Sequence, residues 1–156
     1  MANRDDSDGE NERDFRIGVE QLLTADPADK RAQRSFRIGD LSREFGVSLR
    51  TLRFYEDRGL LSPERRGTTR IYSRRDRMRL RLVLLAKLLG FSLTEAKQII
   101  DLYYQEGGAR KQLTVALERF EEQREILEDQ KREIEESLEA MSITTQFVRS
   151  RLAALD

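Results

Sequence analysis

The sequence of 156 residues contains no cysteine and no histidine. Without these residue types the chain cannot form disulfides, thiolate metal sites or iron–sulfur clusters, and it cannot use Cys or His in catalysis. Long apolar runs are also missing, because the longest, Leu82–Ala86, is interrupted by Lys87. A signal peptide or membrane span needs a longer run. We therefore expect a soluble, cytoplasmic protein with no metal and no cofactor.

Negative charge is scarce in the middle of the chain. Residues 35–105 carry 15 Lys and Arg against 8 Asp and Glu, a net charge of +7, whereas residues 1–34 and 106–156 carry −3 and −4. The net charge of zero for the whole chain hides this segregation. A basic centre between two acidic segments predicts a polyanionic partner that binds through the middle of the chain.

The composition predicts three parts. Residues 1–34 are rich in acidic and small polar residues and poor in large apolar ones, which is typical of a mostly disordered arm; within it, Phe15–Leu23 could form a turn or two of helix against a partner surface. Residues 35–105 alternate helical patterns with turn residues, which predicts one compact basic domain. Residues 109–156 carry one continuous helical pattern, which we interpret as a coiled-coil dimerisation helix with its tail.

A helix-turn-helix unit is predicted around Gly46. A first helix over Asp40–Phe45 is followed by Gly46, which can adopt the positive φ of a turn. Ser48 is a good N-cap for a second helix that ends near Arg58, with Gly59 as its stop. We expect three apolar residues of this helix to face the core: Leu49, Leu52 and Phe54.

The other residues of the second helix should face outward, and they are Arg50, Thr51, Arg53 and Tyr55. Arginine and hydroxyl groups bind phosphates, and an Arg fork can also reach the edge of a guanine. We predict that Arg50 and Arg53 make groove and phosphate contacts, and that the hydroxyls of Tyr55 and Tyr72 anchor phosphates. Ser48 and Thr51 complete this predicted contact surface.

A basic hairpin follows the second helix. Pro63 and Gly67 mark its turns, and three arginines crowd it, namely Arg65, Arg66 and Arg70. The hairpin could be an ordinary solvated turn. Three arginines beside a recognition-type helix favour a DNA-contacting wing instead.

Two further helices are expected in this domain. Ser73 with Asp76 resembles a capping box that begins a helix running to about Leu89, and Ser92 with Glu95 is a full capping box for the next. Arginines at the start of the first of these helices could form a solvated face, with Arg74 and Arg75 as the better phosphate candidates. Its buried side is predicted to hold Met78, Leu82, Leu85 and Leu89.

An apolar residue recurs every seven positions from Leu113 to Leu155, and a second row four residues later turns polar in its middle. This heptad pattern could pack on its own domain, but too little chain remains to cover it, which favours pairing with a second copy. The β-branched run Ile143–Thr145 predicts that the tail after Met141 bends back or frays. The expected dimer contacts are Leu113, Leu117, Phe120, Leu127, Ile134, Leu138, Met141 and Val148.

Seven stretches of the basic domain form one recognisable pattern: Phe36–Leu41, Gly46–Ser48, Thr51–Glu56, Gly59–Leu61, Pro63, Arg70–Tyr72 and Leu89–Leu93. Taken together, they closely resemble the MerR family of bacterial transcription regulators. The resemblance covers about Phe36 to Tyr103, and the later helix matches in architecture.

The resemblance implies a mainly α fold, with a winged helix-turn-helix domain joined to a long dimerisation helix that forms an antiparallel coiled coil. It implies a homodimer that binds a pseudo-palindromic promoter operator and bends and untwists the DNA, so that RNA polymerase engages both promoter elements. The family's recognition-helix contacts fall on Ser48, Arg50, Thr51, Arg53 and Tyr55. Its wing contacts fall on Arg66, Arg70 and Tyr72.

The chain departs from the metal- and redox-sensing members, because it has no cysteine near the end of the long helix. We also expect no ligand domain after Asp156. The wing and the following helix look like members linked to fatty acid or branched-chain breakdown, which implies an acyl-CoA or organic acid effector. The rival hypotheses are an architectural DNA-bending protein and a coiled-coil protein that docks an acidic partner; an enzyme is disfavoured.

Overall fold

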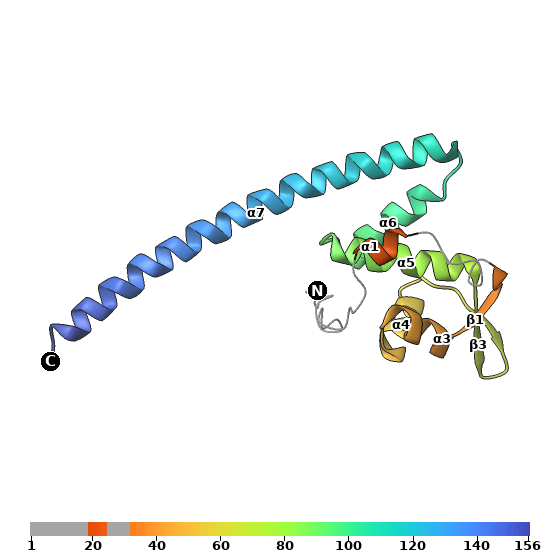
Figure 1. The fold of residues 1–156 in the computed structure, drawn as a ribbon, viewed down its shortest axis with the longest axis horizontal. Helices are drawn as coiled ribbons and strands as arrows, with labels where there is room; N and C mark the ends of the chain where they lie inside the picture. The colour runs from red at the N-terminus through yellow and green to blue at the C-terminus, as the bar shows by residue number, and fades with distance from the viewer. Residues whose placement is uncertain (1–18, 25–31) are drawn as a thin grey trace, which may run out of the picture. The chain divides into compact units, whose positions relative to one another are not determined.

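The computed structural model describes residues 19–24 and 32–156. The chain divides into two compact units, one up to Gln105 and the other from Glu106 to Asp156. Most of the predicted acidic arm lies outside the described residues. Within it, Val19–Leu23 forms a short helix, α1, which lies against α5 and buries Leu22 in the main core (Figure 1). This helix lies within Phe15–Leu23, the segment of the arm for which a turn or two of helix was predicted.

The first unit contains the predicted helix-turn-helix. Helix α3 spans Ile38–Phe45, α4 spans Leu49–Asp57, and Gly46 joins them with a φ of 66°. The Ser48 hydroxyl accepts a hydrogen bond from the Thr51 amide at 3.0 Å, which confirms the predicted N-cap. α3 begins two residues earlier than expected because the Asp40 carboxylate accepts a bond from the Arg37 amide at 2.9 Å.

The wing, which is the hairpin of β2 and β3, belongs to a three-stranded antiparallel sheet in the order β1-β3-β2. Strands β2 (Glu64–Arg66) and β3 (Thr69–Ser73) form the predicted hairpin, whose turn contains Gly67 at a φ of 65°. The third strand, β1 (Ser35–Arg37), overlaps the short extended segment that the sequence predicts at Phe36–Ile38. It pairs with β3 and places Phe36 opposite Tyr72, a pairing that the sequence did not predict. Through this pairing the start of α3 is fixed beside the wing.

Two helices complete the first unit, and both begin at the predicted capping boxes. Helix α5 spans Arg74–Leu88 and α6 spans Leu93–Tyr103. The predicted buried side of α5 is wrong for Met78, which is exposed, whereas Leu82, Leu85 and Leu89 are partly buried and pack against the core. The fully buried leucines and valine of this helix are Leu80, Val83 and Leu84. The true core face is rotated around the helix because α5 packs against α1, α6, β1 and β3 together.

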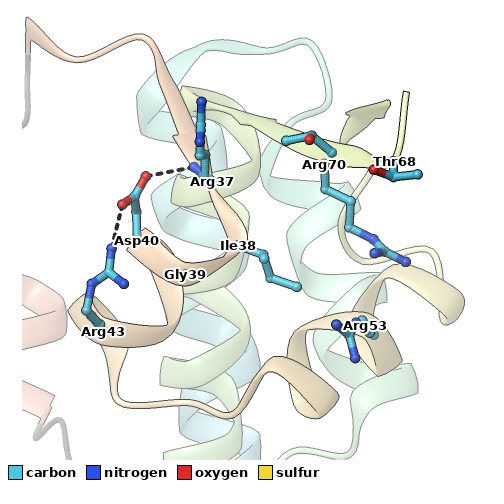
Figure 2. A pocket seen from close by; sticks show the side chains of 9 residues that line it. Arg37, Ile38, Gly39, Asp40, Arg43, Arg53, Thr68 and Arg70 are labelled. Atoms are coloured by element: carbon cyan, nitrogen blue, oxygen red, sulfur yellow. Dashed lines mark hydrogen bonds and ion pairs between the residues drawn. The ribbon is translucent and has the colours of Figure 1, made fainter. Parts of the chain in front are cut away.

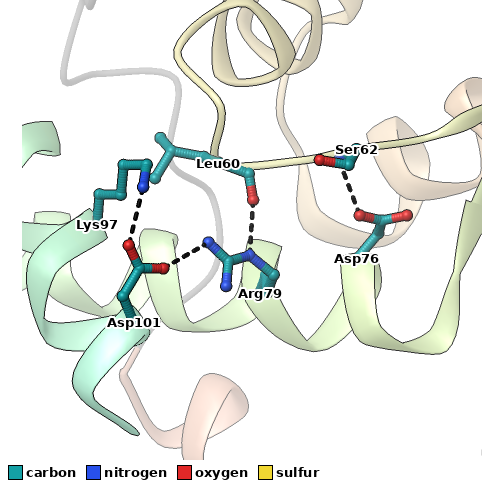
Figure 3. Close-up of polar contacts among 6 residues, drawn as sticks. All are labelled: Leu60, Ser62, Asp76, Arg79, Lys97 and Asp101. Carbon is teal, nitrogen blue, oxygen red and sulfur yellow. Dashed lines mark hydrogen bonds and ion pairs between the residues drawn. The ribbon is translucent and has the colours of Figure 1, made fainter. Parts of the chain in front are cut away.

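Polar contacts fix the segment between α4 and the wing on α5. The Asp76 carboxylate accepts bonds from the amides of Ser62 at 2.9 Å and Ser73 at 3.0 Å. Arg79 donates to the Leu60 carbonyl at 2.9 Å and to Asp101 at 3.2 Å (Figure 3). A hydrogen bond from Lys97 and a weaker one from Arg79 outweigh partial desolvation and lower the pKa of Asp101. These bonds tie α4, the wing and α6 to one supporting helix.

The second unit is one helix, α7, which spans Gly108–Ala153. At 1.5 Å per residue its 46 residues extend for about 69 Å. The predicted bend or fraying after Met141 is wrong, because the helix continues through the β-branched run to Ala153. None of the described helices is long and apolar enough to cross a membrane.

Candidate nucleic-acid interface

Helix α4 presents two arginines on its outer face. Arg50 and Arg53 are exposed, and Leu52 between them is fully buried. The hydroxyls of Ser48 and Thr51 lie at the start of the helix, 2.9 Å apart, and bond to each other; the Ser48 hydroxyl also accepts from the Thr51 amide. Four of the predicted contact residues are therefore gathered along the first two turns of one helix.

Tyr55 does not face outward, so the predicted orientation of this residue is wrong. Its side chain has no exposed surface and belongs to the main core. The reason is helical spacing, because Tyr55 lies three residues after the buried Leu52 and shares its face. Leu49, predicted to be buried, is 41% exposed instead. A hydroxyl that is inaccessible in this way cannot anchor a phosphate without a rearrangement of the core.

Tyr72 is also buried, which corrects its predicted role as a phosphate anchor. It lies on β3 opposite Phe36, so the pairing of β1 with β3 covers it. Burial, and then the nearby Glu56 carboxylate, raise the pKa of the Tyr72 hydroxyl. Tyr72 therefore stays protonated and fixes the wing to the core.

The wing arginines are tied to α4 to different degrees. Arg70 donates to Glu56 at 2.7 Å and is only 21% exposed, whereas Arg65 donates to the same carboxylate at 3.2 Å and is largely exposed. Arg66 forms only a loose pair with Glu64, at 3.9 Å, and is exposed. Arg74, at the start of α5, is exposed directly after β3. The structure thus brings all the predicted wing residues except Tyr72 to the surface beside α4.

Arginines from four elements surround an open depression of about 400 Å³ at the start of α3. Figure 2 shows Arg37, Arg43, Arg53 and Arg70 around this first turn. Arg43 is held by the Asp40 carboxylate at 2.8 Å, and Thr68 and Thr69 add hydroxyl groups from the turn of the wing. Cations, hydroxyls and a helix N-terminus are the groups that bind a phosphate.

The sequence reasoning missed Arg37 and Arg43. Both lie beside the first turn of α3, one immediately before the helix and the other at its sixth residue. A basic residue on each side of a helix start could have indicated an anion site. Their convergence with Arg53 and Arg70, however, depends on the wing being folded next to α3.

The predicted dimer contacts lie along α7, and in the single chain all eight are at least 37% exposed. In the part of the chain that the structure describes, no group of three or more acidic residues is placed to hold a metal ion.

Known proteins share this architecture. The family model "MerR HTH family regulatory protein" matches residues 36–102, and the model "MerR, DNA binding" matches residues 77–142. The crystal structure of MtaN, the N-terminus of the Bacillus subtilis multidrug transporter activator, is 30% identical with a TM-score of 0.58; the match covers 70% of this chain and 96% of MtaN. The chain belongs to the MerR family. This family consists of DNA-binding transcriptional regulators, which are not enzymes.

Two further similarities support the MerR assignment. A MerR family transcriptional regulator from Bacillus cereus is 29% identical with a TM-score of 0.58, over 72% of this chain and 81% of that one. The transcriptional regulator HmrR of Rhizobium leguminosarum bv. viciae is 42% identical over 67 residues, which are 42% of this chain and 52% of HmrR. This MerR chain therefore spans about half the length of that curated relative.

Proposed function

We propose that this MerR-family protein binds a pseudo-palindromic promoter operator as a homodimer and distorts the DNA. The observation that carries the proposal is that Arg53 of α4 and Arg70 of the wing line one depression in a domain with a net charge of +7. One helix offers base-reading groups, and the neighbouring wing offers phosphate-binding groups, which is the division of roles that sequence-specific binding requires.

The depression at α3 extends this surface toward the DNA backbone. Arg37 and Arg43 would meet a phosphate there, while Arg50 and Arg53 lie in the groove. A duplex bound in this way loses affinity steeply as salt increases, because each neutralised phosphate releases counterions. A coiled-coil protein docking an acidic partner would instead show a shallow salt dependence and no competition by duplex DNA.

Helix α7 supplies the second half of the proposal. Its heptad row is exposed from Leu113 to Leu155, and the middle of its companion row is polar. Pairing with a second copy removes the apolar row from water, and the polar positions specify the register. An antiparallel pair would hold two DNA-binding units at a fixed separation. That separation sets the spacing of the half-sites, which an architectural DNA-bending protein does not require.

The remaining parts of the proposal concern partners. The dimer would act on RNA polymerase indirectly, through the shape of the promoter, in the cytoplasm where the bacterial chromosome lies. An organic acid or acyl-CoA would be the effector.

Footprinting tests whether the protein binds a promoter operator. The DNA used is the promoter of the protein's own gene and the neighbouring divergent promoter. Two protected half-sites are expected, and an unprotected promoter would contradict the proposal.

Replacing Arg53 with alanine should weaken binding to the footprinted operator by about 1–3 kcal/mol, because the variant loses a groove contact. The measurement is a fluorescence anisotropy titration at fixed salt. Arg132→Ala is the charge-matched control, since Arg132 is exposed on α7. The dimer should remain intact in both variants. If wild type and Arg53→Ala bind the operator with equal affinity, Arg53 does not contact the DNA.

Arg37→Ala should have a different effect, because Arg37 faces a backbone phosphate in this proposal. Its affinity for the operator and for a scrambled duplex should fall by the same factor, and the log–log salt slope should become shallower by about one unit. Titrations at several salt concentrations measure both quantities. A loss confined to the operator would show that Arg37 reads bases, and an unchanged slope would exclude a phosphate contact.

A further inference from the structure

One carboxylate joins α4 to both strands of the wing. Glu56, in the last turn of α4, accepts a bond from Arg65 of β2 on Oε1 at 3.2 Å and from Arg70 of β3 on Oε2 at 2.7 Å. The Glu56 side chain is 17% exposed. Both of its oxygens therefore accept a hydrogen bond from the wing.

The two arginines that Glu56 contacts are direct partners in the β2–β3 ladder. Residues opposite each other in an antiparallel pair have Cβ atoms about 4.5–5.5 Å apart, and like charges in that position destabilise the pair. The hairpin thus contains a built-in repulsion. The Glu56 carboxylate, which lies against both guanidinium groups, offsets it.

Packing alone does not fix the outer strand of the wing. All three residues of β2 are exposed, so the strand buries no side chain in the core. Its position depends on the ladder to β3 and on the Arg65–Glu56 contact. Glu56 lies one helical turn after Arg53, so the same face of α4 carries a groove-reading arginine and the wing contact.

Glu56 is held in its charged form. Partial burial raises its pKa, but the hydrogen bonds from Arg70 and Arg65 outweigh burial and lower it overall. A negative charge beside a DNA-binding surface should by itself weaken DNA binding. A structural role of Glu56 between α4 and the wing would offset this unfavourable effect on DNA binding.

We propose that Glu56 is a positioning residue for sequence-specific DNA binding. It neutralises the Arg65–Arg70 repulsion and sets the place of the wing relative to α4, so that the wing arginines and Arg53 meet the duplex in one geometry. The proposal rests on the DNA-binding function proposed above. It adds that this acidic residue strengthens binding to the preferred sequence although it opposes binding to DNA in general.

The test compares Glu56→Gln with Asp57→Asn, which removes the same charge at the next, exposed position of α4. The full chain is titrated with a duplex that the wild type selects from a random-sequence pool and with a scrambled version of that duplex. Glu56→Gln should lower the selected-to-scrambled affinity ratio by about tenfold, because two charged hydrogen bonds are weakened. Asp57→Asn should tighten both duplexes slightly and equally. If Glu56→Gln tightens both duplexes in the same way, the inference is wrong.

Hydrogen exchange of the free protein gives a readout without DNA. Backbone amides of β2 and β3 should exchange about tenfold faster in Glu56→Gln than in wild type or Asp57→Asn. Adding Arg65→Gln to Glu56→Gln should restore protection, because the like-charge pair is then removed. Equal exchange in all variants overturns the inference. A wild type that does not distinguish the two duplexes overturns the proposed function instead, and the exchange results still decide the role of Glu56.

Discussion

If the proposed homodimer forms along α7, replacing Ile134 with glutamate should convert it to a monomer at micromolar concentration. Ile134 is the fourth of the seven positions in the heptad row, so an antiparallel pair that uses the whole row places it opposite its own copy. The substitution would bury two like charges against each other, and burying unpaired charge is strongly unfavourable. Operator affinity should fall by about 100-fold or more, because two linked half-site contacts become one.

Ile143→Glu is the matched control for this experiment. Ile143 lies nine residues after Ile134, which is two and a half turns of helix and therefore the opposite face. Both side chains are similarly exposed in the single chain, at 65% and 59%. Sedimentation equilibrium should show Ile143→Glu as a dimer. A dimeric Ile134→Glu, or two equally monomeric variants, would contradict the heptad row as the dimer seam.

Replacing Arg77 with methionine should destabilise the DNA-binding unit by about 3–5 kcal/mol, which is the usual cost of removing one partner of a buried ion pair. Arg77 is 5% exposed, and its Nε lies 3.1 Å from both oxygens of Glu44 on α3, to which Nη2 also donates. Its guanidinium lies 5.6 Å from the ring centres of both Phe36 and Phe45. The substitution leaves a partly buried carboxylate without its cation.

Urea unfolding followed by tyrosine fluorescence measures this change. The chain has no tryptophan, and its four tyrosines all precede residue 106, so the signal reports on the first unit alone. Arg74→Met, three residues earlier on the same helix and exposed, should shift the midpoint little. The double variant Glu44→Met with Arg77→Met should recover most of the loss, because no unpaired charge remains. If the double variant loses as much free energy of unfolding as Arg77→Met alone, the contribution of Arg77 to stability comes from packing and not from its charge.

Local signals determined much of the fold. A cap is an interaction between residues three apart, and so the sequence was sufficient to place the starts of α4, α5 and α6 at Ser48, Ser73 and Ser92. The positive φ at Gly46 and Gly67 followed in the same way, because turns are short-range structures. The exposure of Arg50, Arg53, Arg65 and Arg66 could be predicted because nothing in their immediate neighbourhood could bury four charged side chains. Arg70 is largely covered instead, because Glu56 of α4 binds it.

Most of the errors concern residues whose surroundings come from distant segments. Tyr72 has a polar end that suggested exposure, and Arg77 belongs to a run of arginines that suggested a solvated face. Tyr72 is buried beside β1, and Arg77 is buried against Glu44 of α3, both far away in the sequence. The depression that joins Arg37 and Arg43 to Arg53 and Arg70 has the same origin, since it exists only after the wing packs beside α3. Tyr55 is the exception, because its burial follows from its helical spacing after Leu52.

By itself, the sequence determined the order of the elements, the basic centre, the family resemblance and the apolar row of the last helix. Each of these features depends only on residue spacing and composition over short stretches of the chain. The tertiary structure alone decided which polar residues are internal and how one glutamate on α4 meets two arginines of the wing. Amphipathic side chains such as Tyr and Arg can satisfy either environment. Their placement therefore depends on which partner the fold brings to them.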